Sequence, residues 1–174
     1  FKFKVELTDA PKPLGSGLQG GQQSEVLDLR TLAGQSVNLQ LTIRSEAFNT
    51  NRLGFYQVDN AQGTITDSLG NTFNPGDAGY LRAAVAQWAG QESVSTTSGR
   101  NFSTTVNVAG GGIWVPFMIT NGTLDQLLDA DPNNNPTVFT PFLGSNPGRG
   151  DYVKLLGDNT FGFEDMAAGD FDYD

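Results

Sequence analysis

Histidine and cysteine are both absent from the 174-residue sequence. Their absence excludes histidine-dependent serine or cysteine catalysis, zinc sites with nitrogen and sulfur ligands, haem ligation through histidine, and disulfides. Most common enzyme mechanisms are therefore unavailable, and we expect a protein that is not an enzyme. The chemistry that remains is that of oxygen ligands, because the chain has 14 Asp, 5 Glu and many Asn residues. Such side chains suit hard cations, Ca²⁺ above all.

Charged residues are few, and their charge is unevenly placed. They make up 17% of the chain, and the net charge is −9. No basic residue follows Lys154, and six acidic residues after it carry two-thirds of the excess: Asp158, Glu164, Asp165, Asp170, Asp172 and Asp174. Lys and Arg are scattered singly apart from Lys2 and Lys4, which leaves no basic stripe to neutralise phosphates. We expect no nucleic-acid partner.

Long apolar runs are also missing. No stretch approaches the roughly 18 consecutive apolar residues of a membrane span, so we expect no membrane insertion. No secretory signal is visible, and the chain begins at Phe1 rather than Met, which predicts a processed product or a piece of a longer protein. The acidic, cysteine-free composition, rich in Asn, Gly and Thr, favours a secreted protein of the bacterial cell surface.

Turn residues and alternating patterns predict the fold class. The 22 Gly and 8 Pro residues indicate many turns, and Phe1 to Thr8 alternate apolar with polar side chains as a half-buried strand does. We predict a single mainly β domain over residues 1–174, an antiparallel, jelly-roll-like β-sandwich of about eight to ten strands with one or two short helices. Its parts are an N-terminal strand at 1–9, a Gly/Pro-rich loop at 10–24 and a body at 26–174.

Individual elements follow from the same patterns. The clearest strand covers residues 37–44, and residues 52–58 and 63–67 read as a hairpin around a turn at 59–62. A helix is expected from Tyr80 to Trp88, with Asp77 as its N-cap, and a shorter one from Thr123 to Asp129. Residues 112–120 are apolar enough for a strand buried on both faces. Further strands are expected at 101–108, 138–143, 152–156 and 160–164.

The acidic C-terminal stretch carries the most chemistry. In an extended chain Asp170, Asp172 and Asp174 point to one side, about 6–7 Å apart, and a curl at Gly169 lets alternate carboxylates surround one cation. Glu164 or Asp165 then returns as a further ligand, and a turn at Asp158 can fold onto the same ion. The alternative is a solvated acidic tail. Phe161, Phe163, Phe171 and Tyr173 interleave with the acids, which favours a segment packed on a core.

Other candidate sites have simpler interpretations. Residues 129–135 place oxygen side chains at alternate positions, but the Gly and Glu of a helix-loop-helix calcium site are missing, so a plain turn is favoured. Trp88, Trp114 and Tyr152 are able to stack on a sugar, yet core positions are the default for aromatic residues. Glycosidase chemistry needs two carboxylates that face each other. Glu164 and Asp165 are adjacent in the sequence and do not face each other. A catalytic pair would therefore need a distant second carboxylate, such as that of Asp151.

Five segments together resemble a known family. They are Glu46 to Asn49 followed by Gly54 to Tyr56, then Pro75 to Tyr80, Leu156 to Asp165, and Gly169 to Asp174. Their order and spacing over about residues 26–174 resemble domain-of-unknown-function family 4114, found in large secreted and surface proteins of cyanobacteria and marine bacteria. The chain departs from the family pattern in the short turn Met166 to Gly169 and in ending at Asp174, where the family continues with a further Asp and a strand.

The resemblance implies an extracellular β-rich module whose acidic C-terminal motif binds calcium through Glu164, Asp165, Asp170 and Asp172. We therefore expect a Ca²⁺-stabilised structural or adhesive module of the cell surface or extracellular matrix. The N-terminal strand and the missing strand after Asp174 suggest an open sheet edge, hence self-association into a filament by strand addition. The alternative is a carbohydrate- or peptide-binding module of a large adhesin, with a glycan or surface polymer as its partner.

Overall fold

Residues 2–7, 25–46, 49–88, 94–96, 100–157 and 159–166 are described by the computed structural model. Their strands are β1 (Lys2–Leu7), β2 (Leu27–Asp28), β3 (Ser36–Ser45), β4 (Asn51–Val58), β5 (Ile65–Thr66), β6 (Thr72–Phe73), β7 (Val94–Thr96), β8 (Arg100–Ala109), β9 (Ile113–Thr120), β10 (Thr137–Phe139), β11 (Val153–Gly157) and β12 (Thr160–Phe163). The helices are α1 (Tyr80–Ala86) and α2 (Leu124–Leu128), with short 3₁₀ turns at Arg30–Leu32, Pro132–Asn134, Leu143–Ser145 and Pro147–Arg149.

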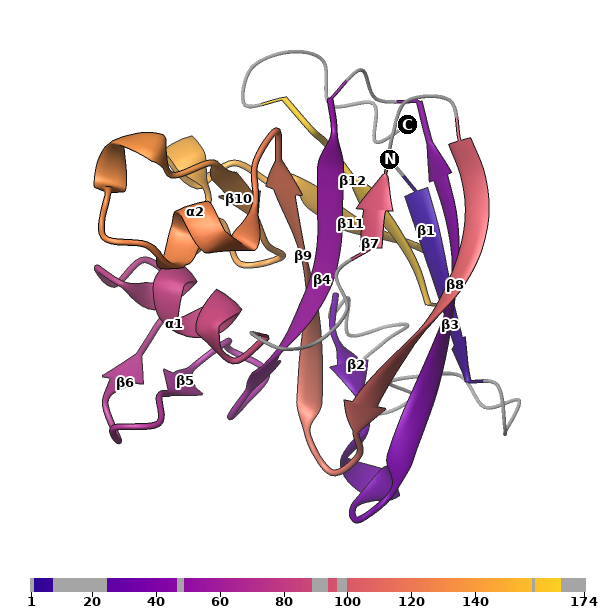
Figure 1. Ribbon diagram of the computed structural model, residues 1–174. Coiled ribbons are helices and arrows are strands. Elements are labelled where there is room, and N and C mark those ends of the chain that lie inside the picture. The colour runs from indigo at the N-terminus through magenta and orange to yellow at the C-terminus, as the bar shows by residue number, and fades with distance from the viewer. Residues whose placement is uncertain are drawn as a thin grey trace.

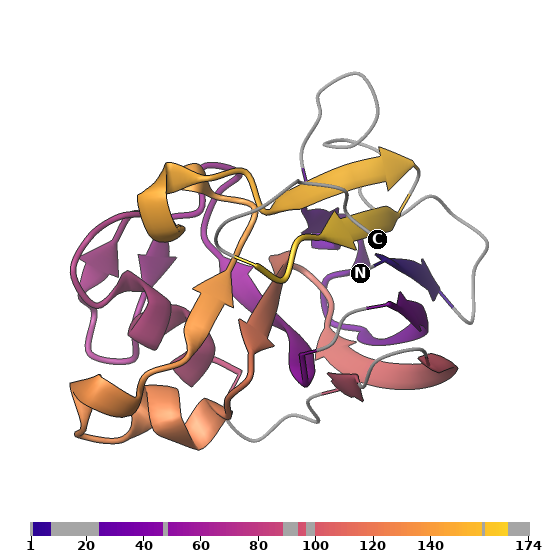
Figure 2. The ribbon, with the colours of Figure 1, turned by 90° about the horizontal axis from the view of Figure 1, so that it is seen from above.

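Two antiparallel sheets form the body of the protein, and two short helices accompany them. The sequence-based prediction of a mainly β fold with one or two short helices is confirmed. Sheet A has the strand order β11-β12-β1-β3-β8. Sheet B has the order β10-β9-β4-β7, and β2 also pairs with β9. The small β5–β6 pair and both helices lie on the side of sheet B away from sheet A (Figures 1 and 2). None of the helices in the described ranges is long and apolar enough to cross a membrane.

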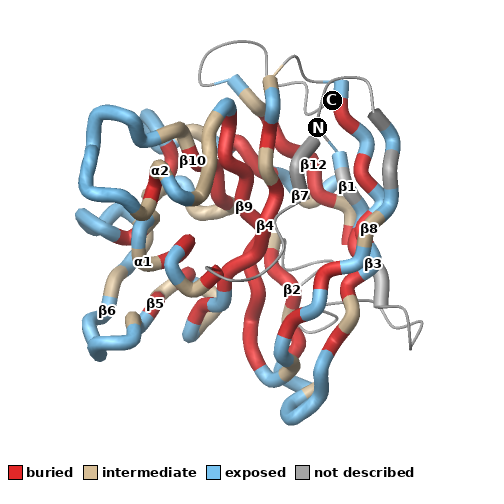
Figure 3. The backbone as a smooth tube through the Cα atoms, viewed as in Figure 1, coloured by how far each residue is buried: buried red, intermediate tan, exposed pale blue. Residues whose placement is uncertain are grey.

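Strand β9 lies at the centre of this arrangement. All eight of its residues are buried, whereas β3 alternates buried with exposed residues along its length (Figure 3). The contrast follows from the layers, because β3 has solvent on one face while β9 is covered on both. The prediction of a strand at 112–120 buried on both faces is confirmed. One cluster of buried apolar side chains runs through both sheets and α1.

The N-terminal strand is interior to sheet A. Phe3 of β1 pairs with Phe161 of β12 on one side and with Ile43 of β3 on the other. The strand that begins the chain is therefore not the open sheet edge on which the expectation of self-association partly rested. In the described parts of sheet A, the strands at the two ends of the order are β8 and β11.

Two local predictions were wrong. The turn after β4 forms, with Asp59 N donating to Thr64 O at 2.8 Å, but β5 pairs with β6 instead of continuing a hairpin with β4. The neighbours of β4 are β9 and β7, which bury it more completely. The N-cap of α1 is Gly79 at φ 87°, not Asp77. Asp77 instead accepts a hydrogen bond from Asn74 N at 2.7 Å and so closes the turn before the helix.

The shorter helix follows its prediction closely. Thr123 is the N-cap of α2 and Asp129 its C-cap. Gln126 N donates to Thr123 Oγ1 at 3.3 Å, while Thr123 N donates to Gln126 Oε1 at 2.9 Å. This reciprocal pair is a capping box, which supplies acceptors for amides that a helix start leaves without partners.

The helical layer is fixed to sheet B by a buried pair of tyrosines. Tyr80 of α1 donates its hydroxyl to Gly63 O at 2.8 Å, and its oxygen lies 3.2 Å from that of Tyr56 on β4. Burial raises the pKa of both hydroxyls above the usual value of 10. In the folded state both groups therefore stay neutral at pH values where an unfolded chain ionises them.

We expect Tyr80→Phe to lower the free energy of unfolding by about 1–2 kcal/mol at neutral pH, because the buried Gly63 carbonyl loses its donor. Since the folded-state pKa values are raised, stability is retained below about pH 10 and falls as the pH rises further. Urea unfolding at a series of pH values measures both effects, and the decline above pH 10 is expected to be shallower in the variant. A variant as stable as the wild type at neutral pH contradicts the assignment.

Candidate functional site

Glu164 and Asp165, two of the six predicted metal ligands, lie where the chain leaves sheet A. Glu164 N donates to Tyr152 O at 2.9 Å, which extends the pairing just past the end of β12. The next carboxylate reaches the other sheet: Asn51 Nδ2, at the start of β4, donates to Asp165 Oδ2 at 3.1 Å. Asn49 Nδ2 also donates to the Asp165 carbonyl oxygen at 3.4 Å. The segment after β12 is thereby tied to the first residues of β4.

The Glu164 carboxylate is almost fully buried, with 6% of the residue exposed. Its Oε1 accepts a hydrogen bond from Met166 N at 3.1 Å. Its Oε2 is buried and has no hydrogen-bond partner among the described residues. A buried carboxylate oxygen without a donor is costly unless a proton or a cation compensates it. This oxygen is the feature of the described chain that most clearly calls for a further ligand.

The other four predicted ligands, Asp158, Asp170, Asp172 and Asp174, lie outside the described residues. Within the described part of the chain, no three acidic side chains gather closely enough to hold a metal ion. Two carboxylate oxygens are nevertheless suitable ligands for Ca²⁺. One is Glu164 Oε2, and the other is Asp165 Oδ1, because Oδ2 of the same carboxylate accepts the hydrogen bond from the Asn51 amide. Ca²⁺ binds six to eight oxygens, so the remaining ligands have to come from other groups.

An asparagine network supports these carboxylates, and sequence reasoning missed it. Asn121, at φ 50°, donates its amide to Asn49 Oδ1 at 2.7 Å and accepts from Thr50 N at 3.1 Å. It thereby connects the end of β9 to the residues that hold Asp165. The available signal was the dipeptide Asn121-Gly122, which indicates a turn, together with Asn49 inside one of the motifs quoted for the family.

The Asn-rich segment at 129–135 forms the turn that its composition favours. Asp129 accepts hydrogen bonds from Asp131 N at 2.8 Å and from Asn134 Nδ2 at 2.9 Å. These bonds, led by that from Asn134, hold the pKa of Asp129 below its usual value. The core interpretation of the aromatic residues is also confirmed, because Trp88, Trp114 and Tyr152 are at most 4% exposed.

Glu25 and Asp151 form a separate pair of carboxylates beside β11. Asp151 Oδ2 lies 3.9 Å from Lys154 Nζ. Burial, followed by the negative charge of Asp151, raises the pKa of Glu25 to about 7. A hydrogen bond from the Leu155 backbone and the charge of Lys154 act in the opposite direction but do not compensate. The folded protein thus holds a proton on Glu25 that the unfolded chain releases above about pH 4.5.

We expect the stability of the wild type to fall as the pH rises from about 4.5 to 7, because the unfolded state loses its Glu25 proton first. Glu25→Gln should remove this fall in the free energy of unfolding. We expect the fall to be below about 2 kcal/mol, since the carboxyl group is partly exposed to solvent. The urea midpoint across this pH range measures it, with Glu46→Gln as the control at an exposed carboxylate. Equal slopes for the wild type and Glu25→Gln contradict the assignment.

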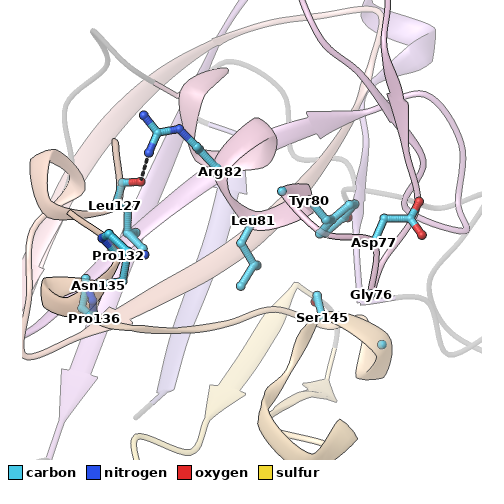
Figure 4. Close-up of a pocket in the computed structure, with 12 residues that line it drawn as sticks. Gly76, Asp77, Tyr80, Leu81, Arg82, Leu127, Pro132, Asn135, Pro136 and Ser145 are labelled. Atoms are coloured by element: carbon cyan, nitrogen blue, oxygen red, sulfur yellow. Dashed lines mark hydrogen bonds between the residues drawn. The ribbon is translucent and has the colours of Figure 1, made fainter. Parts of the chain in front are cut away.

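A cavity of about 500 Å³ separates α1 from α2 and the turns that follow (Figure 4). Leu81 extends into it, with Pro132 and Pro136 on one side and Ser145 on the other. Its size falls in the roughly 300–1,000 Å³ range of small-molecule pockets. The lining combines apolar with polar groups: Gly76, Asp77, Gly79, Tyr80, Leu81, Arg82, Leu127, Pro132, Asn135, Pro136, Gly144 and Ser145.

Two contacts fix the walls of this cavity. Arg82 of α1 donates to the carbonyl oxygens of Leu127 at 3.1 Å and Asp129 at 2.6 Å, and also to that of Leu128, so its guanidinium binds the end of α2. On the opposite wall, a Cβ on Gly144 would lie 2.5 Å from Pro75 O. Only glycine allows these two loops to approach so closely. The cavity is therefore held open by short contacts on both sides.

Comparison with known proteins gives one match. A family model described as "Domain of unknown function (DUF4114)" matches residues 109–174. The resemblance inferred from the sequence is confirmed over this range, which is shorter than the 26–174 on which it was based. No curated protein and no solved structure matches the chain.

Proposed function

We propose that this chain, whose residues 109–174 match the DUF4114 family, is a calcium-binding structural or adhesive module of the bacterial cell surface or extracellular matrix. The observation that carries the proposal is the buried Oε2 of Glu164, for which the described part of the chain supplies no hydrogen-bond partner. A cation at this oxygen compensates the cost of burying the carboxylate, and Ca²⁺ is the hard cation that carboxylate and carbonyl oxygens favour.

The surroundings of Glu164 support a cation taken from solution. The chain has no basic residue after Lys154 to neutralise the acids that follow, and six of the nine excess negative charges lie in this stretch. Asp165 is already held by Asn51, so the backbone next to Glu164 is in place before an ion arrives. Asp158, Asp170, Asp172 and Asp174, outside the described residues, are the proposed further ligands.

Calcium at this position would have a mechanical consequence. Glu164 and Asp165 follow β12 of sheet A, while the asparagines that hold Asp165 belong to or precede β4 of sheet B. An ion shared with later carboxylates therefore strengthens a connection between the two sheets. Extracellular modules typically bind Ca²⁺ at 10⁻⁴–10⁻³ M, which matches a role outside the cell.

Self-association by strand addition remains part of this proposal, but it requires another edge than β1. The ten-residue strand β8 ends the order of sheet A in the described chain, and strands at sheet edges present unpaired backbone groups to a neighbouring chain. Addition to β8 would leave the calcium ligands at the end of β12 untouched, since β1 and β3 lie between β12 and β8.

We expect about 10 mM Ca²⁺, which is roughly 10 to 100 times the dissociation constant of such a module, to add about 1.4–2.7 kcal/mol and so raise the melting temperature by about 3–10 °C. Glu164→Gln keeps the shape of the side chain but removes its charge, and it should lose most of this shift. Glu46→Gln removes an exposed carboxylate and should show the same shift in melting temperature as the wild type. Calorimetric titration with Ca²⁺ provides a second readout that does not depend on unfolding. No shift and no heat with the wild type would refute the calcium site.

The cavity between α1 and α2 favours a second candidate, a carbohydrate- or peptide-binding module of a large adhesin. Its volume and mixed lining suit a small ligand or one side chain of a peptide. Leu81→Trp would fill the cavity, while Leu143→Trp adds the same bulk at an exposed position of a neighbouring turn. Screening on glycan and peptide arrays should give a ligand that binds the wild type and Leu143→Trp at least tenfold more tightly than Leu81→Trp. Arrays without any hit count against this candidate.

A further inference from the structure

Cationic side chains that are distant in the sequence lie side by side on the outer face of sheet A. The strand register aligns Lys154 of β11 with Gly162 of β12, Gly162 with Lys2 of β1, and Lys2 with Arg44 of β3. We call Lys154, Lys2 and Arg44 the basic row. With strands about 4.8 Å apart, the row spans about 14 Å across the sheet. Lys4 lies beside it, opposite Thr42 and Thr160.

This row is unusual in a protein with a net charge of −9. Lys2 and Arg44 are exposed and directly opposite each other, and no described carboxylate lies within ion-pair distance of either. Like charges in directly opposed positions destabilise an antiparallel pair. Acidic groups lie at the two ends of the row and beyond it: Asp151, 3.9 Å from Lys154, with Glu25 beside it, the exposed Glu46 after β3, and Glu6, whose register position on β1 is opposite Gln40. An anionic ligand bound at Lys2 and Arg44 would offset this repulsion, which explains why two cations lie opposite each other.

The exposed residues of β3 and β8 on this face, beyond Arg44, are uncharged and rich in hydrogen-bonding groups. Gln40 and Thr42 of β3 are exposed opposite Thr105 and Ser103 of β8. Farther along, Asn107 Nδ2 donates to both Ser36 Oγ at 2.7 Å and Asn38 Oδ1 at 2.8 Å. These side chains hold one another in fixed positions across two strands. The face therefore presents ordered hydroxyl and amide groups next to a row of cations.

We propose that the outer face of sheet A binds an anionic polysaccharide, with the basic row contacting its carboxylate or sulfate groups and the Thr, Ser, Gln and Asn side chains contacting its hydroxyl groups. A protein partner is less suited, because protein interfaces are centred on several aromatic or apolar anchors, whereas the large apolar side chains described as exposed on the strands of sheet A amount to Leu156 of β11, at 45%. A single-stranded nucleic acid is disfavoured because the exposed residues named here include no aromatic side chain on which its bases stack.

This inference uses no residue of the proposed calcium site, so the two proposals succeed or fail separately. Direct contact between cations and polyanion predicts binding that weakens steeply with salt but persists when a chelator removes Ca²⁺. Binding through a bridging Ca²⁺ predicts the reverse, a loss of binding with chelator. The same measurement therefore distinguishes the two.

The test uses heparin as a sulfated probe, alginate as a carboxylate probe and dextran as a neutral control, each measured by calorimetry at low salt with and without chelator. Lys2→Gln/Arg44→Gln should weaken binding of a charged probe by roughly five- to tenfold, as expected for two partly screened contacts. Arg30→Gln/Arg149→Gln changes the net charge equally at exposed positions outside the strands of sheet A and should have little effect. Without a probe, the first variant should melt at the same temperature as the wild type or higher, because the like-charge pair is gone.

Several results would overturn the proposal. These are no binding of either charged probe, equal weakening in both double variants, dextran bound as well as the polyanions, or loss of binding with chelator. Duplex DNA bound more tightly than heparin or alginate would replace the polysaccharide with a nucleic acid. Sedimentation showing a dimer that Lys2→Gln/Arg44→Gln dissociates would instead assign the face to a second copy of this chain.

Discussion

The structure depends on the burial of one strand, β9, on both of its faces. An eight-residue strand of apolar side chains cannot leave either face in water, so sheet A has to cover one face and the helical layer the other. Phe117 of β9 shows how closely this is done, because its ring lies 2.6 Å from where a Cβ on Gly54 of β4 would be and also packs edge-on against Trp88. The positions of both candidate sites follow from these layers. The Glu164 region lies where the two sheets meet, and the cavity lies within the helical layer.

Short-range patterns were sufficient to predict most elements but not their partners. Strands β3, β8, β9 and β12 and both helices fall where alternation, apolar runs and capping residues place them, because these signals act within a few residues of each other. The expected hairpin after β4 does not form: β5 is only two residues long and pairs with β6, whereas β9 pairs with β4 along the whole length of that strand. Pairing between distant strands is decided by the whole core, and a turn signal alone does not reveal it.

Local sequence signals also reveal only part of the candidate sites. Counting acids along the chain identifies Glu164 and Asp165, because the signal is local. It does not reveal that Asn51 holds Asp165, since that contact joins residues 114 positions apart. Scattered Lys and Arg residues appeared unable to form a basic surface, yet the register of four strands places Lys154, Lys2 and Arg44 in one row. Surfaces composed of distant strands become visible only when the sheet order is known.

The interior position of β1 also determines when folding can be completed. Lys2 pairs with Gly162, so sheet A closes only after a strand from the first residues meets one made 160 positions later. During synthesis, β3 and β8 can pair while β1 still lacks its second neighbour, which leaves an unpaired strand edge until β12 has been made. Sheets that join such distant segments fold slowly, since the loop must close before the contacts stabilise it. Charged side chains, lysine in particular, discourage an unpaired strand edge from pairing with another chain. Lys2 and Lys4 can have this effect on β1 until β12 pairs with it.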